Sequence, residues 1–135
     1  MIDLTTYVGK PWEKSRDCWY WFRVVQRDIF GRDVHEALVN HSSWIAMLKS
    51  AADIMNSDIE KEFGWKKTDS PKTGDAVFLS MRRYAHHIGT VFIDNGKLCI
   101  LHCVEGSGIV YDSRLAIKMH GWRIHGYWTP KRENE

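Results

Sequence analysis

Apolar residues recur at helical spacing early in the chain. One face of a helix is formed by Cys18, Phe22, Val25 and Ile29. Asp17 is suited to cap the start of this helix, and Gly31 is suited to end it. The pattern therefore predicts a helix from about residue 18 to residue 30, with Cys18 in its first turn.

A second apolar stripe follows at the same period. Its members are Trp44, Leu48, Ala51, Ala52, Met55, Ile59 and Phe63. Ser42 and Ser43 offer an N-cap, and Gly64 a stop. We expect this helix to face the core, and the alternative of a partner-binding helix stays open.

From Asp75 onward the pattern becomes strand-like. The expected strands are Asp75–Ser80, His87–Asp94, Lys97–Val104, Ile109–Asp112 and Trp122–Trp128. Lys66–Gly74 is polar and is expected to be a loop, and Asn95-Gly96 predicts a two-residue type I′ hairpin. Helices followed by a meander predict a single α+β domain over residues 1–135, with N-terminal helices packed on a five-stranded antiparallel sheet.

Composition excludes several classes of protein. The net charge of +2, from 19 basic and 17 acidic residues, lacks the basic excess of a nucleic-acid binder. Met1–Gly9 does not resemble a signal peptide, and no apolar run is long enough for membrane insertion. We expect synthesis in the cytoplasm and three free thiols, because Cys99 and Cys103 on one strand lie roughly 13 Å apart.

The predicted hairpin places two histidines on one face of the sheet. With a two-residue loop, Asp94 pairs with Lys97 and Gly89 lies opposite His102. His87 then shares a face with His102 at a diagonal distance that allows a hydrogen bond between the rings. A three-residue loop would select His86 instead.

A helix-terminal cysteine and two neighbouring histidines are the groups that a cysteine hydrolase needs. Cys18 is the candidate nucleophile, since the helix terminus favours its thiolate, and we expect it to be the most reactive thiol. His87 is the candidate base and His102 the group that orients it, while the Cys18 N–H can donate to an oxyanion. A buried structural cysteine with structural histidines is the simpler alternative.

Zinc binding is a further alternative, because Cys18, His87, His102 and Cys103 are all usable ligand types. However, Cys103 is expected to face away from His102, and no closely spaced ligand pair occurs. We therefore expect neither a metal nor another cofactor.

Several segments resemble the NlpC-type papain-like cysteine peptidases, above all those of tailed-phage tail assembly proteins. In the family's order they are Gly9–Trp12, Asp17–Trp19, Pro71–Val77, His87–Val91, Leu101–Cys103 and Trp122–Trp128. The resemblance covers nearly the whole chain. It implies a papain-like NlpC-type fold with Cys18 as nucleophile, His87 as base and His102 as orienting residue.

The resemblance also implies a substrate and a setting. The substrate class is the stem peptide of bacterial peptidoglycan, cut at an amide bond beside a D-amino acid. The implied partners are phage tail-tip proteins, so the protein is expected in the host cytoplasm during assembly and then in the virion tail.

Three aromatic residues depart from the family pattern or compensate for a departure. Trp12 stands where relatives often have a tyrosine near the nucleophile, and Tyr7 is a candidate substitute for its hydroxyl. Trp19 replaces a small residue and is expected to narrow the substrate groove. Two alternatives to the endopeptidase stay open: a structural tail-assembly protein that retains the fold with little activity, and an amidase or acyltransferase on the same scaffold.

Overall fold

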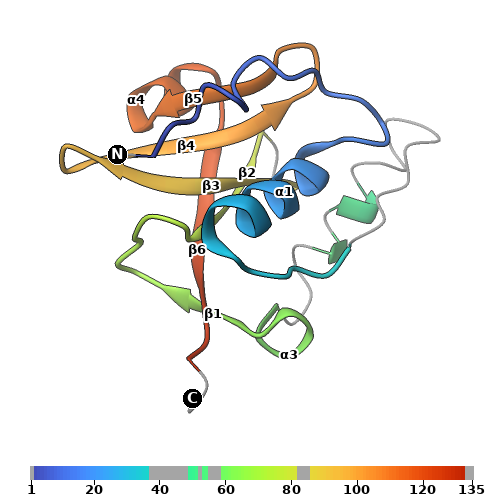
Figure 1. Cartoon of the computed structure of the whole chain (residues 1–135), viewed down its shortest axis with the longest axis vertical. Coiled ribbons are helices and arrows are strands. Elements are labelled where there is room, and N and C mark those ends of the chain that lie inside the picture. The colour runs from blue at the N-terminus through green and yellow to red at the C-terminus, as the bar shows by residue number, and fades with distance from the viewer. Residues whose placement is uncertain (1, 37–48, 52, 55–58, 82–85, 133–135) are drawn as a thin grey trace.

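The computed structural model describes residues 2–36, 49–51, 53–54, 59–81 and 86–132 (Figure 1). In chain order its elements are α1 (Cys18–Phe30), α3 (Ile59–Phe63), β1 (Trp65–Thr68), β2 (Ala76–Ser80), β3 (His87–Asp94), β4 (Lys97–Val104), β5 (Gly108–Ser113), α4 (Arg114–Met119) and β6 (Arg123–Pro130). The strands form one antiparallel sheet in the order β1-β6-β2-β3-β4-β5. The predicted α+β class is confirmed, but the expected five strands are six.

The first helix has the predicted bounds for the predicted reasons. The Asp17 carboxylate accepts a hydrogen bond from the Tyr20 backbone N–H, and Gly31 ends the helix with a φ of 65°. On the buried side, the Gln26 amide donates to the Gly74 carbonyl at 3.0 Å. This bond joins α1 to the loop before β2, so it fixes the helix against the sheet.

The hairpin between β3 and β4 also forms as predicted. Asp94 pairs with Lys97, and both loop residues have positive φ, 52° at Asn95 and 76° at Gly96. Positive φ at both positions is the requirement of a type I′ turn. The register of the two histidine-bearing strands is therefore the one expected from the sequence.

The core has two layers, one on each face of the sheet. On the α1 side, two clusters of buried residues adjoin, one of Trp19, Phe22, Val34, Ile59, Trp65, Ala76, Phe78 and Ile88 and one of Val25, Phe92, Leu101, Cys103 and Ile109. On the other side they are Val77, Leu79, Val91, Ile100 and Ile117. Because side chains alternate along a strand, β2 supplies both layers in turn.

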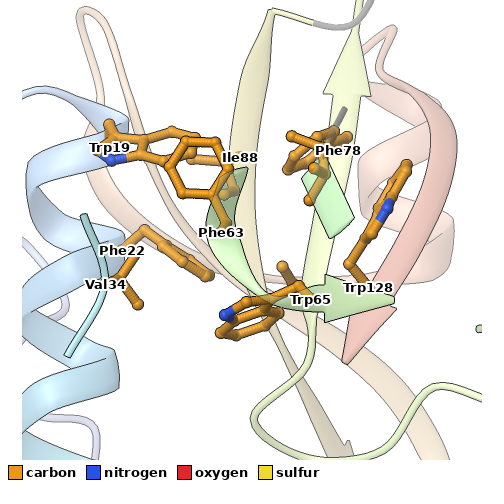
Figure 2. Close-up of a pocket in the computed structure, with 10 residues that line it drawn as sticks. Trp19, Phe22, Val34, Phe63, Trp65, Phe78, Ile88 and Trp128 are labelled. Atoms are coloured by element: carbon orange, nitrogen blue, oxygen red, sulfur yellow. The ribbon is translucent and has the colours of Figure 1, made fainter. Parts of the chain in front are cut away.

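Figure 2 shows aromatic rings from α1, α3, β1, β2 and β6 around a narrow apolar cavity on the α1 side. Phe78 and Trp128 stack there with their ring centroids 4.4 Å apart. The cavity volume of about 20 Å³ has room for little more than one water molecule. It is a packing gap in the core, too small to receive a peptide side chain.

Two elements correct the expectations. The segment expected to be a loop contains β1, which pairs Trp65 with Pro130 at the edge of the sheet. Lysines on an edge strand guard it against pairing with other chains, and their polarity concealed the strand in the sequence. The short helix α4 was also missed, although Ser113 caps it by accepting from the Ala116 N–H.

The predicted second helix is only partly described. Residues 49–51 and 53–54 are helical, and α3 ends before Gly64, which has a φ of 70°. The rest of that predicted helix lies outside the described residues. Within the described part of the chain, no helix is long and apolar enough to cross a membrane.

Candidate active site

Cys18 is the first residue of α1, at the end of the helix where backbone N–H groups lack helical partners. The residue is partly exposed, but burial of its thiol raises the pKa to about 12, and the Asp17 carboxylate adds to this. Hydrogen bonds from the Ile88 and Trp19 backbones act in the opposite direction. The structure thus differs from the expected thiolate-favouring site, because desolvation outweighs the helix terminus in this conformation.

The two histidines of the hairpin are in direct contact. His87 Nε2 lies 2.8 Å from His102 Nδ1, and the ring centroids are 5.0 Å apart. Gly89 makes this approach possible, since a Cβ there would lie 3.1 Å from the His102 Cβ. The predicted contact between His87 and His102 is confirmed. His86 does not take part in it, and its Nε2 accepts from the Met81 N–H at 3.2 Å.

Asp112 extends the pair into a chain of three groups. Its Oδ2 lies 2.9 Å from His102 Nε2, and the His102 side chain is fully buried. Asp112 was not predicted to belong to the site. The turn between β4 and β5 could have predicted it from the sequence. That turn sets a register in which Ile100 pairs with Asp112, so Asp112 lies on the same face of the sheet as His102.

The hydrogen bonds among Asp112, His102 and His87 indicate which nitrogen of each imidazole carries the proton. An ionised Asp112 only accepts, so His102 carries its proton on Nε2. Burial lowers the pKa of His102 despite the raising effect of Asp112, so the ring is neutral and its Nδ1 is an acceptor. His87 must then donate through Nε2. Burial also lowers the pKa of His87 well below its usual value, which leaves a bare lone pair on Nδ1.

Trp122 covers the two rings from the side of α4. It stacks on His87 with ring centroids 4.4 Å apart at 17°, and it meets His102 edge-on at 6.0 Å. The sequence pattern predicts Trp122 as the first residue of the last strand, but β6 begins at Arg123 and Trp122 precedes it. Its ring excludes water from the histidine pair, which is consistent with the lowered pKa values.

The Cys18 side chain and the His87 ring lie on opposite faces of β3. His87 pairs with Leu79, which belongs to the layer away from α1, whereas Ile88 faces α1. The Cys18 sulfur accepts from the Ile88 backbone, so it lies beside the peptide that follows His87. No hydrogen bond joins Cys18 to His87 in the described structure. The structure therefore assembles the histidines and brings the thiol to the adjacent peptide.

The three aromatic candidates lie apart from the histidines. Tyr7 donates to Asp28 at 3.4 Å, ten residues along α1 from Cys18, or roughly 15 Å along the helix axis. Trp19 is buried in the α1 layer and its indole donates to the His35 carbonyl at 3.0 Å, so it fills the core. Trp12 packs in the α1 layer near Val25 and Cys103.

The zinc alternative gains no ligand set. Cys18, His102 and Cys103 line one small cavity, but both nitrogens of the His102 ring are engaged by His87 and Asp112 instead. Among the described residues, no group of three or more histidine, cysteine or acidic side chains could hold a metal ion.

The described site is a carboxylate–imidazole–imidazole chain on an α+β scaffold, next to a helix-terminal thiol. Comparisons of the chain with protein-family models, curated proteins and solved structures found no match.

Proposed function

We propose that the protein is a cysteine endopeptidase of the NlpC type. The observation that carries the proposal is the Asp112–His102–His87 chain. It leaves Nδ1 of His87 as a base without a hydrogen-bond partner in the described structure. The Cys18 sulfur lies beside the backbone N–H of Ile88, the residue that follows His87. A buried base oriented by two further groups is an arrangement that suits proton transfer.

The reaction follows from these groups. The reaction requires the Cys18 side chain to leave its packed position and reach the opposite face past the start of β3, where its S–H proton passes to His87 Nδ1. The thiolate attacks the amide carbonyl, and the Cys18 backbone N–H donates to the oxygen that becomes negative. His87 returns the proton to the leaving nitrogen as the C–N bond breaks, and water then hydrolyses the thioester through the same base.

The substrate and the setting come from the motif resemblance. We propose stem peptides of bacterial peptidoglycan as the substrate and phage tail-tip proteins as the partners. The protein would act from the virion tail after assembly in the host cytoplasm. The order of the motifs over nearly the whole chain supports this assignment.

One observation favours the second candidate, a structural tail-assembly protein that retains the fold. The Cys18 thiol is packed away from solvent and its pKa is raised to about 12. A protein that only docks in the tail needs no thiolate. The packed thiol is the resting form in both proposals, and only the peptidase requires it to turn toward His87.

Cell-wall digestion tests the proposal. Purified peptidoglycan is incubated with the wild-type protein, with Cys18→Ala and with Cys99→Ala, and the soluble products are identified by mass spectrometry. We expect new peptide ends with the wild type and Cys99→Ala only. Release of intact stem peptides from the glycan would instead identify an amidase, and products that persist in Cys18→Ala would exclude the thiol mechanism.

Thiol titration separates the peptidase from the docking protein. The rate of Cys18 alkylation is measured against pH in the wild type and in His87→Ala. A working pair gives a step below the ordinary thiol pKa of about 8.5 that disappears in His87→Ala. A single step far above that value, unchanged in His87→Ala, supports the docking protein.

A further inference from the structure

An open groove lies on the face of the sheet that carries the histidine pair. Its volume is about 620 Å³, and it runs between α4 and the start of β6. The residues that line it are Arg114, Leu115, Ile117, Lys118, Trp122, Arg123 and Ile124. It is thus large enough for several residues of a peptide, unlike the small cavities beside α1.

The groove is positively charged, and among the residues that the structure describes none that line it is acidic. Arg114 donates to the neutral Tyr127 hydroxyl at 3.2 Å. Lys118 and Arg123 form no ion pair within the described part of the chain. Arg114, Lys118 and Arg123 thus have no acidic partner among the described residues, and such cations around one groove favour an anionic ligand.

Apolar side chains complete the surface. Leu115 is 66% exposed, although an exposed leucine gains nothing from contact with water. Trp122 borders the groove and also stacks on His87. A ligand in the groove would therefore lie beside the proposed base, separated from it by one indole ring.

We propose that this groove binds the free carboxylate groups of the peptide substrate. Lys118 and Arg123 pair with the carboxylates, and Leu115 with the Trp122 edge contacts the aliphatic part of the peptide. The identity of the peptide rests on the proposed function, because stem peptides combine several free carboxylates with alanine methyl groups. Binding in the groove itself requires no cleavage.

Binding is measured with Cys18→Ala, which cannot turn the peptide over by the proposed mechanism. The probe is free stem peptide prepared from bacterial cell wall, and the second probe is the same peptide with its carboxylates amidated. Isothermal titration gives the affinity. The test variant adds Lys118→Gln and Arg123→Gln, and the control of equal charge adds Lys10→Gln and Lys97→Gln, which lie outside the groove.

We expect the groove variant to lose at least about tenfold in affinity for the free peptide, since two charged contacts are removed. The control should bind as Cys18→Ala does, and the amidated peptide should bind weakly to all three proteins. NMR chemical-shift changes at Trp122 on peptide addition should vanish in the groove variant.

Equal affinity of the groove variant and the control would overturn the proposal, as would the absence of binding to Cys18→Ala. Binding of phosphatidylglycerol vesicles that depends on Lys118 and Arg123, without peptide binding, would also overturn it. Peptide binding in the groove by a protein that leaves cell wall intact would support the groove and reject the peptidase.

Discussion

Removal of the Asp112 carboxylate is the sharpest test of the Asp112–His102–His87 chain, called the relay below. Asp112→Ala takes away the acceptor 2.9 Å from His102 Nε2. The His102 side chain is fully buried, so its N–H is left without a partner. Asp112→Asn is the matched control, because it keeps an oxygen in the same place and removes only the charge.

The magnitude follows from the geometry. A buried donor that loses a charged acceptor costs about 1.5–3 kcal/mol of unfolding free energy. For a chain of 135 residues this corresponds to a fall in Tm of about 5–10 °C. Burial lowers the pKa of His102 and Asp112 raises it, so the pKa of this ring should fall further in Asp112→Ala.

The assay combines urea denaturation with nitrogen NMR of the histidine rings. In the wild type, we expect Nε2–H tautomers at both His87 and His102. In Asp112→Ala, His102 can also donate through Nδ1, which moves the His87 proton to Nδ1 and gives a mixture. Unchanged tautomers with a stability loss below about 0.5 kcal/mol would refute the relay, since a solvated surface carboxylate costs no more than that.

Three further predictions concern neighbouring features. Gly89→Ala should cost about 1–3 kcal/mol in urea denaturation, because the new Cβ would lie 2.7 Å from a side chain of β4, and a neutral result would contradict the tight packing. The unfolding free energy should fall as the pH drops below about 6.5, because the pKa values of His87 and His102 are lowered in the folded state and the unfolded chain binds protons first. The unfolding free energy should change by up to about 1.4 kcal/mol per pH unit for each ring, and this dependence should be weaker in His87→Gln. An equal pH dependence in the wild type and in His87→Gln would argue against a neutral buried His87. Asp17→Asn should speed the alkylation of Cys18 at pH 9 while preserving the helix cap, since it removes a charge that raises the pKa of that thiol; an unchanged rate would show that burial alone controls it.

Local signals in the sequence determined the first helix and the hairpin. Asp17 and Gly31 act on backbone groups within a few residues of themselves, so the helix ends where they stand. Asn95-Gly96 fixes the turn type, and the turn fixes the register that pairs His87 with His102. The same period-2 pattern that predicted the strands also predicted which face these histidines share.

Other features depended on partners far away in the chain. The edge strand β1 is defined by pairing with β6, some sixty residues later, and not by its own polar sequence. Asp112 and Trp122 join the histidines only because β5 and β6 return to the same sheet. The pattern of apolar and polar residues within one short segment does not show which distant strand that segment pairs with.

The sequence by itself determined that a helix-terminal cysteine and a histidine pair occur in one small α+β domain. The tertiary structure alone decided from which side of β3 each approaches, and how deeply Cys18 is packed. Caps and turns act through hydrogen bonds between near neighbours. The side of a sheet that a helix covers is instead set by burial of the whole apolar surface, to which every element contributes.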